Sequence, residues 1–500
     1  MTNSDPKKMQ HEERLLINGR LTHAKAGGTF NNINPATEEV MGVVADASAE
    51  DIDQAIAAAR KAFDETDWST NHAFRKHCLE QLHAAIMEEK ELFRAELIAE
   101  VGCPVTLTFG AQFDWPISDG LLWPAHMIDT YPWYRKVSDQ HILGGRPTYR
   151  WVWKEPVGVV AAIIPWNYPF EILINKLGPA LATGNTMVVK AASMTPWNAT
   201  RVGRLIAEKT DIPAGVVNVV ASQNHQVAQM LFSDPRIDMI SFTGSTTTGR
   251  MILEQSAPTF KRTLMELGGK SATIVLDDCN LSAVLPQAVM TAFMHAGQGC
   301  ALPTRLLIPE SRYEECVSTI AAVVKMVGCG DPNDVGTTAG PLVSEKQRDK
   351  VLGYIEKGKA EGARLLAGGG RPKHLKRGWF VEPTVFVDVD NMSTIAQEEI
   401  FGPVLSVITF KDDEDAIRIA NQSKYGLSGF FWSASRERAL NVARRVRTGS
   451  MSINGGQFYG AESPYGGYKS SGIGRQGGIE GMEQYLETKA VGCEFPLMQA

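Results

Sequence analysis

The sequence predicts an α/β protein built on parallel, doubly wound sheets. Two series of short, apolar, β-branched runs predict this class, because helical stretches separate the runs and parallel strands need such crossovers. The second series runs from about residue 271 to 470 and predicts a second α/β domain. We expect strands of the first series at 158–164, 186–189, 216–220, 237–242 and 272–276, and of the second at 305–308, 405–409, 429–432 and 450–453.

Two further segments complete the predicted organisation. Residues 51–100 carry two long helical patterns, in which apolar residues recur every three to four positions, and we expect these helices to pack on a sheet. Residues 133–154 are rich in aromatic and β-branched residues and interrupt the first α/β series. We expect an extended hairpin there, paired with the C-terminal tail 490–496, whose exposed edge needs a partner subunit.

The composition is that of a globular protein large enough for more than one domain. Of the 500 residues 44% are hydrophobic and 21% charged, and the net charge of −6 gives no basic footprint for nucleic acid or a membrane surface. The longest apolar runs, such as 159–164, are too short to span a bilayer, and no signal-like region opens the chain, so we predict a cytoplasmic location. The seven scattered cysteines include no Cys-x-x-Cys pair, so we expect neither a disulfide framework nor a structural metal.

The cysteine at position 300 is the first candidate for chemistry. It follows Gly297, Gln298 and Gly299. Two glycines so close to a thiol let the backbone approach a substrate carbonyl without obstruction, and a thiol can attack that carbonyl. The alternative is a buried structural cysteine, which is the role we expect for the other six.

A glutamate 34 residues earlier is the second candidate. Glu266 precedes a Leu-Gly-Gly-Lys run that we place between two predicted elements, where a carboxylate can reach into a cleft while the backbone turns. A partly buried carboxylate with a raised pKa suits the activation of water. Cys300 and Glu266 together can form a thioester and then hydrolyse it. The alternative is a solvated surface glutamate.

Asn167 is the third candidate, because it lies in a loop that two prolines hold rigid after the C-terminal end of a predicted strand. A side-chain amide on such a loop, together with the backbone N–H of Cys300, can stabilise an oxyanion. The alternative is an N-cap for the helix that we expect to begin near Phe170.

Two further segments suit a nucleotide. The run 242–249 ends a predicted strand and opens a helix, and its small residues expose backbone N–H groups at the positive helix end, as a pyrophosphate requires. It does not match G-x-G-x-x-G. Lys190 ends another predicted strand, where its ammonium can reach a nucleotide ribose at the same sheet edge. The alternatives are an ordinary turn and an exposed lysine.

These motifs, in this order and at these separations, resemble those of the aldehyde dehydrogenase superfamily. The resemblance covers nearly the whole chain and includes two further blocks, 399–403 and 464–475. It implies a Rossmann-like, parallel-sheet cofactor domain, an α/β catalytic domain and a small β-rich oligomerisation domain. The implied bounds are 1–133 with 157–268 for the cofactor domain, 269–470 for the catalytic domain, and 134–156 with 482–500 for the oligomerisation domain.

By this resemblance Cys300 is the nucleophile, Glu266 the general base and Asn167 the oxyanion donor. The implied reaction oxidises an aldehyde to a carboxylic acid with NAD or NADP, through a thiohemiacetal and a thioester on the cysteine and with no metal, in a homodimer or homotetramer. The residues implied to bind the dinucleotide are Ile164, Pro165, Trp166, Lys190, Ser193, Phe242, Gly244, Ser245, Leu267, Glu399 and Phe401. Those implied to line the substrate tunnel are Tyr168, Glu171, Ile172, Asn175, Phe293, Gln457, Tyr459 and Tyr465.

Three positions depart from the family pattern. Ser193 stands where many members have a glutamate that binds the adenosine ribose, and its lack of charge removes the main barrier to NADP, so we predict that NADP is tolerated. His295 replaces an asparagine, and we expect a packing role for it. Gln476 stands where a glutamate is common, so Glu266 has less support from a second carboxylate during hydrolysis of the thioester. The mixed lining of the tunnel is compatible with a medium-length aliphatic, terpenoid or aromatic aldehyde.

Three other functions stay open from the sequence. A CoA-acylating dehydrogenase would replace water by a thiolate, and the presence of Glu266 argues against it. A dinucleotide-independent thiol esterase would leave Lys190 and the turn at 242–249 without a role. A binding protein without turnover is the third, since a fold alone never establishes function.

Overall fold

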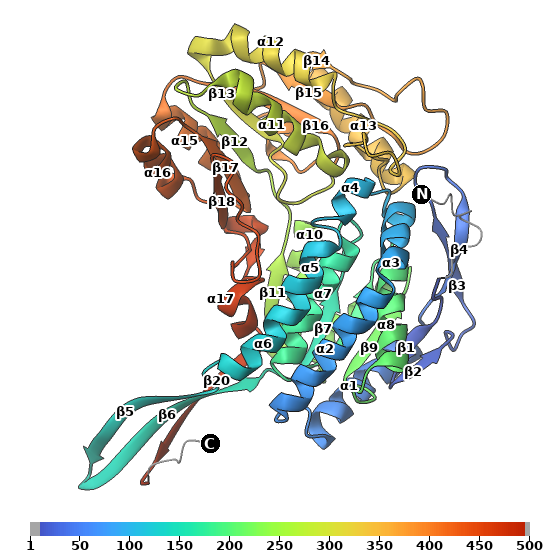
Figure 1. Cartoon of the computed structure of the whole chain (residues 1–500), viewed down its shortest axis with the longest axis vertical. Helices are drawn as coiled ribbons and strands as arrows, with labels where there is room; N and C mark the ends of the chain where they lie inside the picture. The colour runs from blue at the N-terminus through green and yellow to red at the C-terminus, as the bar shows by residue number, and fades with distance from the viewer. Residues whose placement is uncertain (1–10, 496–500) are drawn as a thin grey trace.

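The computed structural model describes residues 11–495, with the backbone alone at 138–143. In this part of the chain the strands form sheets of eight, seven, three and two strands, with helices packed on the two large sheets (Figure 1). The predicted α/β class is confirmed. The two large sheets have separate hydrophobic cores. The chain first crosses from one sheet to the other at residues 267–271.

The first sheet has the strand order β19-β11-β10-β7-β8-β9-β1-β2. Its five central strands are parallel, whereas β19, β1 and β2 add to the edges antiparallel. Strands β7 to β10 are buried throughout, which explains why they read as continuous apolar runs in the sequence. The first four predicted strands are confirmed to within two residues. The bounds are β1 Leu15–Ile17, β2 Arg20–Thr22, β7 Val159–Ile163, β8 Thr186–Ala191, β9 Val217–Ala221, β10 Met239–Thr243, β11 Arg262–Glu266 and β19 Gly472–Ile473.

Helices cover this sheet, and the two long helical patterns predicted in 51–100 are present. Ser48 begins the first helix with a capping box, because its side chain accepts from the backbone of Asp51 while the Asp51 carboxylate accepts from the backbone of Ser48. The α-helices of this half are α1 Ala49–Glu65, α2 His72–Glu88, α3 Lys90–Glu96, α4 Val105–Thr108, α5 Asp114–Ile117, α6 Trp123–Thr130, α7 Pro169–Ala182, α8 Trp197–Lys209, α9 His225–Ser233, α10 Thr246–Ser256 and α17 Gly478–Glu483, with π-helical turns η2 Leu97–Val101 and η3 Ser118–Leu122.

The second sheet has the order β14-β15-β16-β13-β12-β17-β18, parallel except for β14. The predicted strand at 272–276 is β12 of this sheet, so its assignment to the first series is wrong. The chain has already crossed between the sheets at 267–271. The bounds are β12 Ala272–Val275, β13 Arg305–Pro309, β14 Arg364–Ala367, β15 Thr384–Val387, β16 Val404–Phe410, β17 Ser428–Trp432 and β18 Ser450–Ile453, with α11 Leu281–Phe293, α12 Tyr313–Val324, α13 Glu345–Ala360, α14 Thr394–Gln397, α15 Asp413–Asn421 and α16 Arg436–Arg445.

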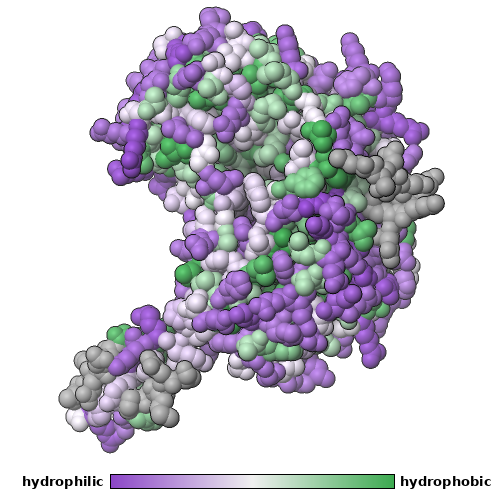
Figure 2. All heavy atoms as spheres, in the orientation of Figure 1, coloured by the Kyte–Doolittle hydropathy of each residue, from purple (hydrophilic) through white to green (hydrophobic). Residues whose placement is uncertain are grey.

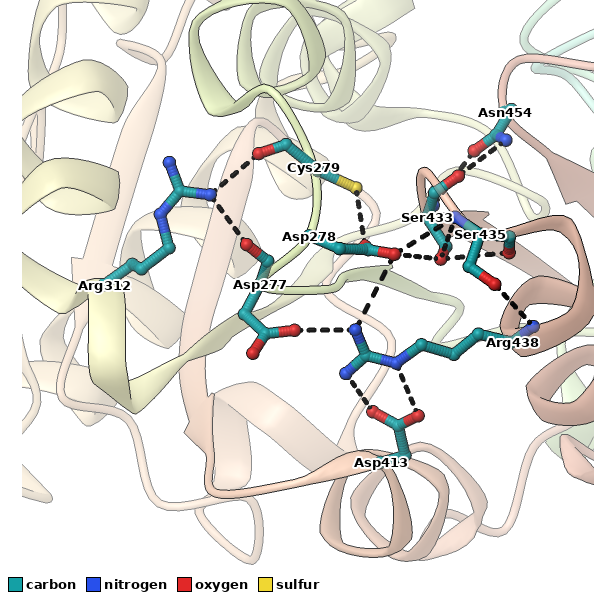
Figure 3. Close-up of polar contacts among 9 residues, drawn as sticks. All are labelled: Asp277, Asp278, Cys279, Arg312, Asp413, Ser433, Ser435, Arg438 and Asn454. Atoms are coloured by element: carbon teal, nitrogen blue, oxygen red, sulfur yellow. Dashed lines mark hydrogen bonds and ion pairs between the residues drawn. The ribbon is translucent and has the colours of Figure 1, made fainter.

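Arg438 on α16 fixes two helices to the end of β12 (Figure 3). Its guanidinium donates to both carboxylate oxygens of Asp413 at 2.7 and 2.6 Å and to Asp277 at 2.7 Å. Asp278 beside it accepts from the hydroxyl of Ser433 at 2.7 Å. Because Asp413 opens α15 and Asp277 follows β12, this polar cluster holds the outer layer of the second sheet in place.

A three-stranded sheet projects from the body at the lower left of Figure 1. It has the order β20-β6-β5, and two left-handed glycines, Gly144 and Gly145, form the turn of its hairpin. The predicted pairing of the hairpin with the C-terminal segment is present along the whole length of β20. Figure 2 shows the outline hollowed between this sheet and the upper lobe. The bounds are β5 Tyr134–Leu143, β6 Arg146–Pro156 and β20 Leu486–Cys493, with β3 Thr29–Ile33 and β4 Val40–Ala45 forming the two-stranded sheet.

Candidate active site

The predicted site residues of the first half lie at the carboxyl ends of adjacent parallel strands. Strands β11, β10, β7 and β8 are neighbours in that order. Glu266 is the last residue of β11, Ser245 follows β10, Asn167 follows β7 and Lys190 is near the end of β8. Ligands of open α/β sheets bind at this edge. Four segments that are far apart in the sequence therefore meet at one place.

Cys300 reaches this edge from the second half of the chain. Its loop follows α11 and contains three successive left-handed residues, His295, Ala296 and Gly297, with φ of +52°, +52° and +72°. A Cβ added to Gly269 would collide with the carbonyl oxygen of Cys300. The glycine therefore allows the backbone of the cysteine to lie directly against the segment that follows Glu266.

The amide of Asn167 lies against the same loop. Its Nδ2 donates to the backbone carbonyl of Gln298 at 3.0 Å. The backbone carbonyl of Asn167 accepts from the side chain of Gln112 at 2.8 Å. The helix that follows begins at Pro169 with Tyr168 as its N-cap and without a side-chain cap. The capping role considered for Asn167 is therefore wrong, and the side chain points to the nucleophile loop instead.

His295 supports this arrangement as a buried, neutral side chain. It is fully buried, its Nε2 lies 3.1 Å from the carbonyl oxygen of Asn167, and its ring packs edge-on to Tyr168 at 5.5 Å. Burial lowers the pKa of His295 to about 4, so the imidazole is neutral. It positions the loop that carries Asn167, which agrees with the packing role predicted for it.

The carboxylate of Glu266 is buried and has no hydrogen-bond partner in the protein. Only 2% of the residue is exposed, so the surface alternative is wrong, and the residue ends a strand rather than lying between elements. Burial raises the pKa of Glu266 to about 8, with Glu171 adding to the rise and Lys176 and Arg475 opposing it. A Cβ added to Gly466 would lie 2.9 Å from Oε1, so this glycine keeps space beside the carboxylate. An unpartnered carboxylate with such a pKa is suited to take a proton from water.

The thiol of Cys300 is partly exposed and lies 3.5 Å from the hydroxyl of Tyr465. Burial raises the pKa of Cys300 to about 12; the hydroxyl of Tyr465 opposes the rise and the carboxylates of Glu266, Glu399 and Glu171 add to it. The thiol form therefore dominates at neutral pH, and reaction requires that a base remove its proton. Cysteines 78, 103, 279 and 316 are buried as expected, but 329 and 493 are partly exposed, so the expectation for those two is wrong.

Lys176 belongs to the site, and our sequence reasoning missed it. It is the one cation in the apolar helix α7, it is fully buried, and its Nζ donates to the hydroxyl of Ser241 at 3.0 Å. Burial lowers the pKa of Lys176 to about 8, and Glu266 and Glu171 oppose that change. A lone lysine among buried apolar residues is the signal that would have found it.

The residues predicted to bind the dinucleotide also gather at this edge. The backbone N–H of Ile164 donates to the carbonyl of Lys190 at 3.0 Å, and the Lys190 side chain is 9% exposed, with a pKa that burial lowers to about 8. Ser245 caps α10 by accepting from the backbone of Thr248 at 3.2 Å, and Gly244 donates to the carbonyl of Glu266 at 3.0 Å. The remaining residues of this half follow the same strand ends: Pro165 and Trp166 after β7, Ser193 after β8, Phe242 in β10 and Leu267 after β11.

Glu399 and Phe401 reach the edge from the second half. The carboxylate of Glu399 accepts from the backbone N–H of Gly269 at 2.9 Å. Phe401 adopts a left-handed conformation with φ of +60°, and its ring lies edge-on to Trp166 at 5.3 Å. A group held at the ends of β7, β8 and β10 would therefore be closed on one side by residues of the second sheet.

Four of the eight predicted tunnel residues interact with Cys300, namely Tyr168, Glu171, Tyr459 and Tyr465. The rings of Tyr459 and Tyr465 lie 5.1 Å apart, and Glu171 accepts from Asn175 at 2.6 Å. Ile172 is buried in the first core, and Gln457 is exposed in the loop after β18. Phe293 is fully buried in the second core, so its place in a tunnel wall has no support, whereas its neighbour Met294 is partly exposed.

A sequence profile described as the aldehyde dehydrogenase family matches residues 22–491. This chain belongs to the aldehyde dehydrogenase family. It is 39% identical over 485 residues to a 3-succinoylsemialdehyde-pyridine dehydrogenase of a Pseudomonas species, covering 97% of this chain and 99% of that protein. It is similar to the NAD+ complex of a Mycobacterium tuberculosis aldehyde dehydrogenase, with 41% identity, a TM-score of 0.92, and coverage of 98% and 99%. It is also similar to the NAD+ complex of a Staphylococcus aureus betaine aldehyde dehydrogenase, with 33% identity, a TM-score of 0.94, and coverage of 99% and 98%.

The family membership makes the chain an oxidoreductase of the aldehyde dehydrogenase class. Within residues 11–495 no helix has the length and apolar character needed to cross a membrane. In the same range, no three His, Cys, Asp or Glu side chains gather in a way that could hold a metal ion.

Proposed function

We propose that this chain oxidises an aldehyde to a carboxylic acid with NAD+ or NADP+, through a thioester on Cys300. The observation that supports this most strongly is the convergence of three groups on one place. The thiol of Cys300, the amide of Asn167 and the unpartnered carboxylate of Glu266 come from separate elements and meet at one sheet edge. Burying a carboxylate without a hydrogen-bond partner costs free energy, so its presence at the same edge as a partly exposed thiol supports a chemical role.

The residues at the strand ends fit a dinucleotide. The N-terminus of α10 presents backbone N–H groups capped by Ser245, as a pyrophosphate requires, and the largely buried Lys190 lies two strands away at the same edge. Ser193 next to it is uncharged, so we propose that NADP is accepted as well as NAD. When bound, the nicotinamide supplies the acceptor for the hydride that is lost from the aldehyde carbon. Glu399 and Phe401 of the second half would orient that ring.

The residues of the chain then act in sequence. The thiol of Cys300 first loses its proton to solvent water. The thiolate then adds to the aldehyde carbon, and Asn167 Nδ2 with the backbone N–H of Cys300 donates to the developing oxyanion. The resulting thiohemiacetal loses hydride and becomes a thioester. Glu266 takes a proton from a water molecule, whose oxygen attacks the thioester carbon and releases the acid and the thiolate. The net reaction consumes one aldehyde, one water and one oxidised dinucleotide, and yields one acid, one reduced dinucleotide and one proton.

The test is an assay of reduced nicotinamide with a panel of aldehydes, for the wild type and for Cys300→Ala. Turnover in the wild type and its loss in the variant support the proposal. Turnover that survives in Cys300→Ala contradicts it. The product is identified in parallel with and without CoA, because acyl-CoA in place of free acid would show that a thiolate, and not water, releases the acyl group.

We also propose the division into domains given by the resemblance, with 1–133 and 157–268 for the dinucleotide, 269–470 for catalysis, and 134–156 with 482–500 for assembly into a homodimer or homotetramer. The projecting three-stranded sheet supports this, because β5 leaves an open edge and its residues Tyr134 and Val137 are more than half exposed. A cytoplasmic location remains a prediction of the sequence.

A further inference from the structure

One acidic side chain beside the thiol has no part in the reaction described above. Glu171 lies in the first turn of α7 and is partly exposed. Its Oε1 accepts from the amide of Asn175 at 2.6 Å, an i, i+4 pair that fixes the carboxylate in one orientation. In the same helix Asn175 directly precedes Lys176.

Electrostatic effects show that Glu171 faces the reaction centre. Its negative charge raises the pKa of the Cys300 thiol and the pKa of the Glu266 carboxyl. It also raises the pKa of the hydroxyls of Tyr168 and Tyr459, and it acts on Lys176. These five groups come from four segments of the chain. Glu171 therefore lies close enough to all five to act on them.

Three carboxylates act on the Cys300 thiol in the space around it. Each of the three carboxylates, Glu171, Glu266 and Glu399, disfavours the thiolate of Cys300, and no cation is among its main electrostatic partners. Lys176 is buried behind the space and already donates to Ser241. Burial raises the pKa of Glu171 to about 7, although the charge of Lys176 and the hydrogen bond from Asn175 oppose the rise, so these two groups offset the cost of burying the carboxylate only in part. A cation that enters with the substrate would supply the remaining compensation.

Aromatic rings line the other side of the same space. Tyr459 and Tyr465 lie 5.1 Å apart, and Phe458 lies 4.7 Å from Tyr459. Tyr459 is 42% exposed, so this group of rings reaches the protein surface. The faces of such rings attract ammonium groups, most strongly where a carboxylate lies nearby and water is excluded.

We propose that this enzyme selects an aldehyde that carries a cationic nitrogen, either a protonated amine or a quaternary ammonium group, with Glu171 as its counter-charge. The inference rests on the proposed function and gives its substrate class. Aldehydes that carry a carboxylate are poor substrates for the same reason, because like charges repel across a partly buried site.

The test compares aldehydes that differ in charge but not in shape. Trimethylammonio-acetaldehyde and 3,3-dimethylbutanal form one such pair; 3-aminopropanal with butanal and 4-aminobutanal with pentanal extend it to longer chains. For each pair kcat/KM is measured with the wild type, Glu171→Gln, and Glu310→Gln as a control that removes an exposed carboxylate from the far end of β13. We expect the wild type to prefer the cation of at least one pair by tenfold or more. Glu171→Gln should reduce that preference at least tenfold, and Glu310→Gln should leave it unchanged.

A second readout separates charge from shape. Because the pKa of Glu171 is about 7 and the quaternary ammonium is charged at every pH, the preference within the first pair should rise from pH 6 to pH 8 more steeply in the wild type than in Glu171→Gln. The charges of Glu266 and Lys176 also act on the cation, and they are present in both enzymes, so the difference between the two profiles reports Glu171.

The outcomes distinguish this inference from the function on which it rests. Cys300-dependent oxidation of neutral aldehydes without a preference for cations, or a preference for 4-oxobutanoate over pentanal, overturns the inference and leaves the proposed function standing. A preference for cations that Glu171→Gln retains also overturns it. Failure to oxidise any aldehyde overturns both.

Discussion

The side-chain amide of Asn167 donates a 3.0 Å hydrogen bond to the backbone carbonyl of Gln298, two residues before Cys300. This bond joins the loop after β7 of the first sheet to the loop after α11 of the second half. The proposed oxyanion donor and the proposed nucleophile are therefore held together by the protein before a substrate arrives. Such preorganisation is what allows a donor to stabilise charge that develops only in the transition state.

Replacing Asn167 by alanine should lower kcat by about 10²–10³-fold, the usual effect of removing one oxyanion donor. Steady-state kinetics with a neutral aldehyde measures this. Asn224→Ala serves as the control, because Asn224 caps α9 and lies outside the site. A loss of less than threefold in Asn167→Ala would remove the amide from the mechanism.

Replacing Glu266 by glutamine should separate the two halves of the reaction. Thioester formation needs the thiolate and the dinucleotide, whereas hydrolysis needs the base, so we expect one equivalent of reduced dinucleotide per active site in a burst. Steady turnover after the burst should be slower by about 10²–10⁴-fold, the usual contribution of a general base. Stopped-flow absorbance measures both phases, and Glu254→Gln, an exposed glutamate on α10, should behave like the wild type.

The wild-type pH profile should show the raised pKa of Glu266. The carboxylate must be ionised to accept a proton, and its pKa is about 8, so kcat should rise with pH through that value and then level off. The positive charge of Lys176 lowers this pKa, so Lys176→Met should move the rising limb to higher pH. Arg475→Met should move it in the same direction. A limb that moves to lower pH in either variant would contradict the assignment.

Ser193 should control the choice of dinucleotide. We expect the wild type to use NADP with a kcat/KM within a thousandfold of that for NAD. In Ser193→Glu the new carboxylate should repel the 2′-phosphate and lower kcat/KM for NADP at least tenfold more than for NAD. A wild-type preference for NAD of a thousandfold or more would show that the serine does not admit NADP.

Arg305 should matter for stability. It is 2% exposed, and its guanidinium donates to four oxygens, those of Lys270, Asn391, Ile419 and Ala420, at 2.9 to 3.1 Å. Arg305→Met leaves these buried acceptors unpartnered, at a cost of about 1–3 kcal/mol for each one that finds no water. We expect the apparent melting temperature to fall by roughly 5–10 °C. Arg312→Met, on the more exposed η6 turn (Glu310–Arg312), should change it much less.

The sequence predicts the central strands well and the edge strands poorly. Strands β7 to β10 and β12, β13 and β16 are buried along almost their whole length, so each appears as a continuous apolar run. Strands β17 and β18 are only partly buried and were also predicted, whereas the buried strand β15 was missed. Strands β1, β2 and β14 are three or four residues long and pair antiparallel at sheet edges, where local sequence carries little signal. Strand β11 was missed as well, although it carries Glu266, because we took its end for a connection.

The site shows the same division between local and long-range information. Cys300, Glu266 and Asn167 stand in short motifs whose glycines and prolines shape the backbone, so the residues alone indicate them. The roles of Lys176 and His295 depend on contacts with residues 65 and 128 positions away in the sequence. Nothing in a single sequence reports such contacts, and only the folded chain reveals them.

The most direct test of the account is to trap the acyl group on the nucleophile. Glu266→Gln is mixed with an aldehyde and the dinucleotide that supports turnover, quenched in acid, digested and examined by mass spectrometry. We expect the peptide that contains Cys300 to gain the mass of the acyl group in proportion to the reduced dinucleotide formed. Stoichiometric reduction of the dinucleotide with that peptide unmodified, or with the acyl group on another residue, would contradict a thioester at Cys300.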